Sequence, residues 1–181
     1  QPTGLSANIT ARDLVITGLS VLDRIYDGTA TAQLNGTALI SALGGDDINL
    51  QGDGSALFID KHAGTDKTVS ISGFTLSGAQ ANNYTLLQPT GLNADILARP
   101  LTVSGLSVSN RVYDGTTTVS ASGDAVFGGT VDGDDMILDS SAYSLSFLDK
   151  HAGTNKKVRI DGITLSGSDA GNYDATDAGL M

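Results

Sequence analysis

The chain has 181 residues, of which 40% are hydrophobic, so it is long enough for one large domain or for two domains of about 90 residues. All 20 acidic residues are aspartates, and against 10 basic residues they give a net charge of −10. This charge argues against nucleic-acid partners and against anionic membranes, because both carry negative charge that would repel the chain. The absence of cysteine excludes a disulfide scaffold and a thiolate zinc site.

The sequence repeats itself. Residues 1–12, QPTGLSANITAR, return at 88–99 as QPTGLNADILAR, and RIYDGTAT at 24–31 returns at 111–118 as RVYDGTTT. DKHAGT occurs at 60–65 and again at 149–154, with the offset grown from 87 to 89 residues. We therefore predict two tandem copies of one domain. Residues 1–10 match the end of a preceding repeat or form a first strand, residues 11–97 form the first repeat, and residues 98–181 form the second, whose last strand we expect to be truncated.

In chain order, most segments alternate apolar and polar residues, as half-buried strands do. The inward positions predicted for the first copy are Ala30, Ala32, Leu34, Ile48, Leu50, Ala56, Phe58, Val69, Ile71, Tyr84 and Leu86. Those predicted for the second copy are Thr117, Val119, Ala121, Met136, Leu138, Tyr143, Leu145, Phe147, Val158 and Ile160. Helical periodicity is absent, apart from a single turn expected in SGAQANNY and SGSDAGNY.

This pattern predicts an all-β fold of two tandem immunoglobulin-like β-sandwich domains. A β-grasp-like open sheet is the alternative, although it normally needs a longer helix. Arg99-Pro100 lies where one copy leads into the next, and proline favours extended geometry there. We expect a semi-rigid joint and an elongated rod.

The YDG motif supplies the first group of candidate residues. Asp27-Gly28 and Asp114-Gly115 are turn-forming pairs, and each follows a tyrosine, Tyr26 or Tyr113, with a large apolar ring and a hydroxyl group. We interpret the motif as a tight turn held by a tyrosine. A tyrosine that stacks on a sugar is the alternative.

The DKHAGT motif also reads as a turn. Asp60 and Asp149 are expected to accept backbone N–H groups, and Gly64 and Gly153 to permit a left-handed residue. His62 and His151 are expected to be exposed or packed at an edge. One histidine and one aspartate do not make a metal site, and the loop contains no serine nucleophile with a positioned base. We therefore name no catalytic residue and no bound cofactor.

Basic side chains near these motifs are expected to clamp one loop against another. Arg24 and Lys67 in the first copy, with their counterparts Arg111 and Lys156, are predicted to pair with aspartates. The candidate partners are Asp47 and Asp60 in the first copy and Asp135 and Asp149 in the second.

A third motif, VDGDDMILD, places several carboxylates close together in the second copy. Calcium prefers six to eight oxygen ligands, several of them from carboxylates. The candidate ligands are Asp132, Asp134, Asp135 and Asp139. We favour a solvated aspartate turn and keep a calcium site as the alternative.

The ordered combination of these motifs resembles the YDG domain, a repeat of large bacterial surface adhesins of the haemagglutinin-like, two-partner-secreted type. The resemblance covers both copies through RIYDGTAT and RVYDGTTT, the GDD turn, DKHAGT, the NY close and the RPLTV junction. It implies a non-catalytic module of an exported protein at the bacterial cell surface, secreted across the outer membrane. It identifies no ligand.

We therefore predict a structural spacer that projects an adhesive tip from the cell. A glycan- or protein-binding adhesion module is the alternative, and a carboxylate-based hydrolase is a third hypothesis with little support because no glutamate is present. The expected partners are neighbouring repeats of the same chain and a host or matrix glycan or protein, with no nucleic acid and no membrane insertion. We expect a monomer.

Overall fold

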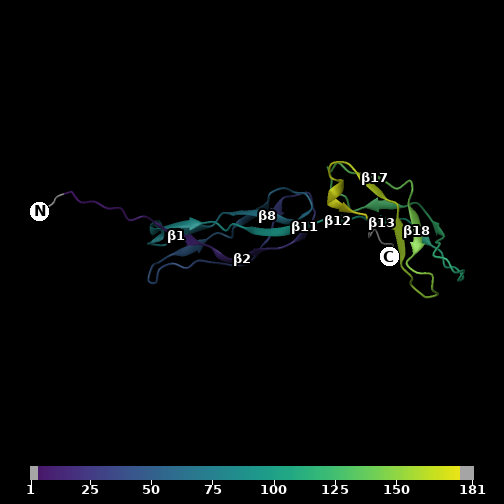
Figure 1. The fold of residues 1–181 in the computed structure, drawn as a ribbon, viewed down its shortest axis with the longest axis horizontal. Coiled ribbons are helices and arrows are strands. Elements are labelled where there is room, and N and C mark those ends of the chain that lie inside the picture. The colour runs from purple at the N-terminus through teal and green to yellow at the C-terminus, as the bar shows by residue number, and fades with distance from the viewer. Residues whose placement is uncertain (1–3, 176–181) are drawn as a thin grey trace. The chain divides into compact units, whose positions relative to one another are not determined.

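The computed structural model describes residues 4–175, and within that range it is built from β-strands and two single-turn 3-10 segments (Figure 1). Contacts divide the chain into two compact units. Unit 1 comprises Gln1–Asp23, Ala30–Asp60 and Asp66–Asp95, and unit 2 comprises Arg24–Thr29, Lys61–Thr65 and Ile96–Met181. The all-β class and the two tandem domains are confirmed. No described residue forms the longer helix that a β-grasp sheet would need, and the last strand predicted for the second repeat lies outside the described residues.

Unit 1 contains most of the strands of the first repeat. They are β1 (Arg12–Val15), β2 (Thr17–Val21), β4 (Thr31–Ala32), β5 (Leu34–Leu39), β6 (Asn49–Gln51), β7 (Ser55–Phe58), β8 (Gly64–Ser72), β9 (Thr75–Ser77), β10 (Tyr84–Leu87) and β11 (Leu92–Leu97), with the 3-10 turn η1 (Ala81–Asn83). β8 and β11 each cross the boundary between the two groups of residues. β2 pairs antiparallel with β5, β6 with β9, and β7 with both β4 and β8, whereas β1 pairs with β10 in parallel.

Unit 2 repeats this plan with shorter strands. They are β3 (Arg24–Ile25), β12 (Arg99–Pro100), β13 (Thr102–Ser104), β14 (Ser107–Val108), β15 (Ala121–Ser122), β16 (Val126–Gly128), β17 (Ile137–Asp139), β18 (Ser144–Phe147), β19 (Val158–Asp161), β20 (Thr164–Ser166) and β21 (Tyr173–Asp174), with η2 (Ala170–Asn172). β12 pairs with β21 in parallel, as β1 does with β10. β17–β20 and β18–β19 correspond to β6–β9 and β7–β8. The sequence analysis did not predict these parallel pairs. It did predict the single helical turns that form η1 and η2.

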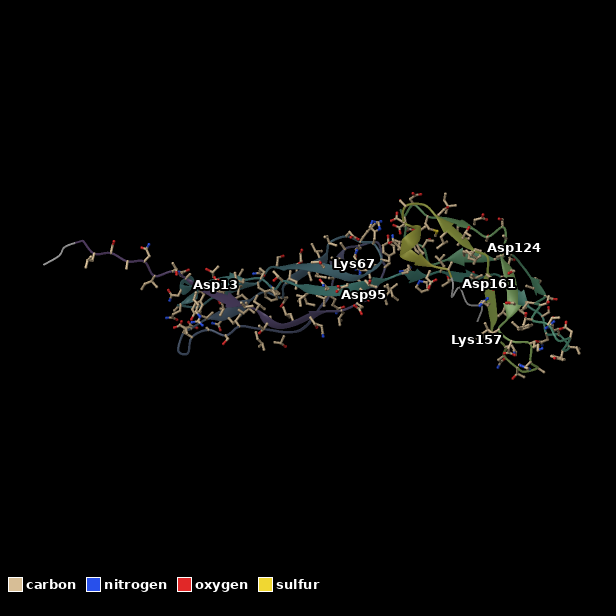
Figure 2. All side chains as sticks on the ribbon, viewed as in Figure 1. Asp13, Lys67, Asp95, Asp124, Lys157 and Asp161 are labelled. Carbon is tan, nitrogen blue, oxygen red and sulfur yellow. The ribbon has the colours of Figure 1, made fainter. Side chains whose placement is uncertain are left out.

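The core of each unit follows the predicted alternation. In β7 and in the second half of β8 every second side chain is buried, with Phe58 3% and Val69 2% exposed. In the second copy Val158 is also buried, but Phe147 is only half-buried. Thr117 and Ala121, both predicted to point inward, are exposed. Exposed aspartates, such as Asp13 and Asp124, project from the surfaces of the strands and turns (Figure 2).

Glycine pairs allow two strands to approach closely. Gly36 has φ +99°, and a Cβ built on it would lie 2.2 Å from the carbonyl oxygen of Gly18 on the neighbouring strand. Gly123 stands in the same relation to Gly105, also at 2.2 Å. Only glycine fits such a position, because a side chain would meet backbone that cannot move aside. The abundance of glycine therefore reflects close strand contacts as well as turns.

Candidate functional site: the YDG and DKHAGT loops

Both YDG loops are closed by the same local clamp. In the first copy, the guanidinium of Arg24 donates to Asp27 Oδ1 and to the carbonyl oxygen of Thr29, at 2.5 Å for the latter. Asp27 Oδ1 also accepts the backbone N–H of Thr29 at 2.9 Å and its hydroxyl at 2.8 Å. Gly28 makes the turn with φ +82°. The loop is thus held by residues no more than five positions apart.

The second copy builds an equivalent clamp. Arg111 donates to Asp114 Oδ2 at 2.6 Å and to the Thr116 hydroxyl at 2.8 Å, while the Thr116 N–H lies 2.9 Å from Asp114 Oδ1. This N–H bond is the main reason that the pKa of Asp114 is lowered. The predicted turn is therefore present in both copies. Each arginine pairs with the aspartate inside its own motif, a partner that the sequence analysis did not name.

The DKHAGT loops are closed by their lysines, as predicted. Lys67 Nζ lies 2.7 Å from Asp60 Oδ1, and Lys156 pairs with Asp149 in the same way. Asp149 Oδ1 also accepts the backbone N–H of His151 at 2.8 Å. These bonds lower the pKa of Asp149, with the lysine as the largest cause.

The left-handed residues of these loops were predicted at the wrong position. Gly153 does not have a left-handed φ. Asp66 and Asn155 do, with φ 52° each. Aspartate and asparagine tolerate this conformation better than other side chains with a Cβ, because their short polar groups bond to local backbone.

A buried carboxylate in unit 2 connects the two motifs. The side chain of Asp134 is 4% exposed, and it accepts the hydroxyl of Tyr26 at 2.8 Å and that of Tyr173 at 2.6 Å. Lys61 Nζ donates to it at 3.0 Å. The rings of Tyr26, which is 0% exposed, and Tyr173 meet edge to face with centroids 5.6 Å apart. We call Tyr26, Lys61, Asp134 and Tyr173 the tyrosine–aspartate cluster.

A second layer of polar contacts lies beside this cluster. Asn172 accepts the backbone N–H of Ala63 at 2.9 Å through Oδ1, and its Nδ2 lies 3.3 Å from His62 Nδ1. Lys61 also lies 3.3 Å from Asp169, and His62 Nδ1 lies 3.8 Å from the same carboxylate. The lysine, histidine and alanine of one DKHAGT loop are therefore all engaged. Both histidines, His62 and His151, are nevertheless exposed, as predicted.

The cluster shifts the acidity of its members. Burial tends to raise the pKa of Asp134, but the hydrogen bonds from Tyr173, Tyr26 and Lys61 outweigh it, and the pKa lies below its ordinary value. Burial and the bond to Asp134 raise the pKa of Tyr173 to about 12, and the same two causes raise that of Tyr26. The ionised carboxylate and the neutral phenols are thus the stable forms at neutral pH.

The first repeat carries half of this arrangement, in Tyr84 and Asp46. Tyr84 donates to Asp46 at 2.7 Å and accepts the Leu43 N–H at 3.0 Å, as Tyr173 does with Asp134 and with Val131 at 2.8 Å. Tyr113, the counterpart of Tyr26, is 58% exposed. The two copies of one motif thus occupy different environments.

The four calcium candidates are not brought together. Asp134 is bound by the tyrosines and Lys61, Asp135 accepts the backbone N–H and hydroxyl of Ser168 at 3.1 and 3.0 Å, and Asp139 accepts the Ser141 N–H at 2.8 Å. Asp132 is exposed. Across residues 4–175 no group of three or more histidine or acidic side chains is arranged to hold a metal ion.

Sequence reasoning missed Lys61, Asp169, Asn172 and Tyr173 as members of a site. The repeated NY pair was a signal, because it recurs at 83–84 and 172–173. The role of Asn172 depends on a contact 109 residues away in the chain, the bond that it accepts from the Ala63 N–H. The cluster is a structural hydrogen-bond network, in which one carboxylate accepts bonds from two phenols and an ammonium group.

The fold and these loops define an all-β tandem repeat whose motif residues form structural turns. A model of the YDG domain family matches residues 10–91 and again 97–179, and the chain therefore belongs to this family. The search of curated proteins returned no match, and neither did the search of solved structures. No helix among the described residues is both long and apolar enough to cross a membrane.

Proposed function

We propose that the chain is a spacer that transmits mechanical force: two YDG repeats that hold an adhesive part of a large bacterial surface protein away from the cell. One observation carries this proposal. In each unit a strand near the start of the repeat pairs in parallel with a strand near its end, β1 with β10 and β12 with β21.

This pairing matters under tension. When the two strands of a parallel pair are pulled from opposite ends, all of their hydrogen bonds are loaded together, because these bonds lie across the direction of the force. When the strands are pulled from the same end, the bonds break one at a time. A chain pulled through its termini loads β1 and β10 in the first way. This geometry suits a module that transmits force.

The motif residues also favour a spacer. Arg24, Asp27 and Thr29 bond to one another, and so do Arg111, Asp114 and Thr116, which leaves these side chains committed to the turn. A glycan-binding module would instead present shared aromatic and amide groups. Tyr113 is the exposed member of its pair and Tyr26 is fully buried, so the two copies share no aromatic platform at this motif.

Single-molecule pulling tests the proposal. The chain has no cysteine, so introduced cysteines give unique handles. Arg12→Cys with Leu87→Cys pulls β1 and β10 from opposite ends, whereas Asp13→Cys with Thr85→Cys pulls a directly opposed pair. We expect the first geometry to need a several-fold higher force. Equal forces in the two geometries would refute the mechanical argument.

A glycan and matrix-protein array with the purified chain tests the binding alternative. The spacer proposal expects no specific hit. A hit that Tyr113→Ala abolishes, while Tyr143→Ala leaves it intact, would favour the adhesion module instead.

A further inference from the structure

Two loops of the first sequence repeat belong to unit 2. The YDG family model matches residues 10–91 as one repeat, which includes the YDG loop at residues 24–29 and most of the DKHAGT loop, at residues 61–65. Contacts nevertheless group both loops with the second repeat in unit 2. The boundary of the folded unit is therefore not the boundary of the sequence repeat, and the reason lies in what these loops contact.

The YDG loop is fixed to the segment between the two repeats by main-chain bonds. β3 pairs in parallel with β11, and the Tyr26 N–H donates to the Leu97 carbonyl oxygen at 2.9 Å. Arg99 extends this contact, because its Nη1 donates to the Tyr26 carbonyl oxygen at 3.3 Å and its Nε donates to that of Gly129 at 2.5 Å. The guanidinium group thus joins the YDG loop to the residue that follows β16.

Side chains are completely buried in the same segments. The three largest fully buried side chains among the described residues are Tyr26, Ile96 and Leu101, and all three belong to unit 2. Gly28 adds a close contact, since a Cβ built on it would lie 2.8 Å from Val131 Cγ1. Because burial of apolar surface is the main source of stability, the YDG loop is part of the core of unit 2.

Two turns of the second repeat hold the polar partners of the loops. Lys61 Nζ lies 3.0 Å from Asp134 Oδ1 and 3.3 Å from Asp169 Oδ1, and these carboxylate side chains are only 4% and 11% exposed. Asn172 accepts the Ala63 N–H at 2.9 Å. We call the residues of these turns that contact the loops the receiving face: Asp134, Asp169, Asn172 and Tyr173.

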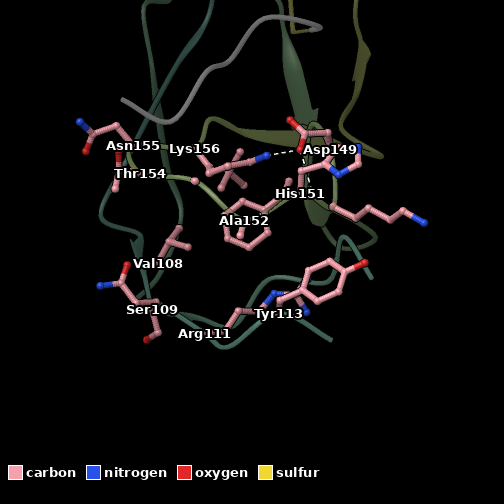
Figure 3. A pocket seen from close by; sticks show the side chains of 15 residues that line it. Val108, Ser109, Arg111, Tyr113, Asp149, His151, Ala152, Thr154, Asn155 and Lys156 are labelled. Atoms are coloured by element: carbon pink, nitrogen blue, oxygen red, sulfur yellow. Dashed lines mark hydrogen bonds and ion pairs between the residues drawn. The ribbon is translucent and has the colours of Figure 1, made fainter. Parts of the chain in front are cut away.

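Closure of a loop and burial of its tyrosine are separate properties. In the second copy the loops close by the same ion pairs, of which Figure 3 shows Lys156 with Asp149. Tyr113 is nevertheless 58% exposed, and the loops line a pocket of about 570 Å³. The full burial of Tyr26 therefore comes from what its loop contacts and not from the turn itself.

We propose that the receiving face is an interaction surface with one partner: the YDG and DKHAGT loops of the repeat that precedes it. The partner fits by chemistry, because the loops present an ammonium group, a phenol and a backbone N–H to the carboxylates and the amide of the face. It also fits by packing, because Tyr26 lies in the core of unit 2. The loops therefore unfold together with unit 2, and the family's motifs join two repeats across the sequence boundary.

Asp169 makes the face selective for a basic loop. Its counterpart in the first repeat is Gln80, and both side chains accept the backbone N–H of an aspartate in the GDD turn, Asp169 at 3.0 Å and Gln80 at 2.8 Å. The aspartate adds a negative charge beside Lys61, which glutamine would not. A glutamine at position 169 would therefore keep the turn and lose the ion pair.

Native-state hydrogen exchange of the whole chain tests which unit the loops belong to. The amides of Tyr26 and Ala63 report on the loops, that of Phe147 on unit 2 and that of Phe58 on unit 1, since all four donate hydrogen bonds. Ile160→Val lies in the core of unit 2, so it should speed exchange at Tyr26, Ala63 and Phe147 by one common factor of about five-fold and leave Phe58 unchanged.

Ile71→Val is the matched control, because Ile71 is the buried counterpart of Ile160 in unit 1. It should speed exchange at Phe58 and leave the two loop amides unchanged. Loop amides that respond to Ile71→Val, or that respond to neither variant, would overturn the proposal.

A double-mutant cycle tests the partner that Asp169 selects. Asp169→Gln should speed exchange at Ala63 and Phe147 about three-fold, because the pair with Lys61 is only partly shielded from water. In a chain that carries Lys61→Met the same substitution should have no effect. An equal effect with and without Lys61 would refute the selectivity. None of these results depends on the spacer proposal, because exchange is measured without load.

Discussion

Removal of the carboxylate of Asp134 should destabilise unit 2 far more than removal of its counterpart Asp46 destabilises unit 1. Asp134 is 4% exposed and accepts two tyrosine hydroxyls, at 2.8 and 2.6 Å. A hydrogen bond to a charged group contributes about 1.5–3 kcal/mol, so Asp134→Ala should cost about 3–5 kcal/mol of the free energy of unfolding. We assign nothing to Lys61, because its side chain is 35% exposed and water can replace the carboxylate there.

Differential scanning calorimetry measures this loss, because it can resolve one unit melting before the other. For a domain of this size, about 3 kcal/mol corresponds to a fall in Tm of at least about 12 °C. Asp134→Asn keeps the volume and should fold, with an intermediate loss, because its amide oxygen can still accept both hydroxyls, as Oδ2 of Asp134 does, but lacks the charge that strengthens these bonds. Asp46→Ala is the matched control, since Asp46 accepts one tyrosine hydroxyl and should shift its transition by less than half as much. Equal shifts for Asp134→Ala and Asp46→Ala would refute the reasoning.

Four further predictions concern acid pH, alkaline pH, a pair of glycines and metal ions. The free energy of unfolding should fall as the pH drops below about 4, because folding lowers the pKa values of Asp134, Asp27 and Asp114, and the stabilisation from these groups is lost as they take up protons. Urea titrations between pH 2 and 7 measure this loss, and a free energy that does not change with pH would contradict the prediction. The free energy of unfolding should also fall between pH 10 and 12, because Tyr173 keeps its proton in the folded state up to about 12 and an unfolded tyrosine loses it near 10; absorbance titration at 295 nm should show a late tyrosine that Asp134→Ala returns toward 10. Gly28→Ala should destabilise the protein more than Gly115→Ala. Both glycines have φ near +80°, but an added Cβ would lie 2.8 Å from Val131 Cγ1 at Gly28 and would meet nothing within 4 Å at Gly115. Similar melting temperatures of the two variants would contradict this prediction. A chelator should leave Tm within about 1 °C, because Asp135 and Asp139 are each bonded to a serine; a larger fall would restore the calcium hypothesis.

Much of the fold could be predicted because the signals are local. Alternation identified the buried faces of β7 and β8, and the Asp-Gly and Asp-Lys spacings identified both loop turns, since these interactions join residues at most seven positions apart. The two 3-10 turns were predictable for the same reason. Ala121 was misassigned because alternation shows that a strand has two faces, but not how completely each face is covered.

The tyrosine–aspartate cluster could not be predicted, because sequence repetition treats the two copies as equivalent and the structure does not. Tyr26 and Tyr113 stand in nearly identical motifs, yet one is fully buried and the other is 58% exposed. The difference arises from Asp134, 108 residues away from Tyr26 in the chain. A local pattern contains no information on a contact at that separation.

The closed YDG loop has a consequence for how the protein is made. Its clamp needs only residues 24–29, so the cost of closing the loop is small, and it can form soon after these residues leave the ribosome. Asp134 arrives more than a hundred residues later. The turn that carries Tyr26 can therefore be complete before Asp134 is synthesised. Folding in chain order thus places the Tyr26 hydroxyl in position to donate to Asp134 when that residue follows.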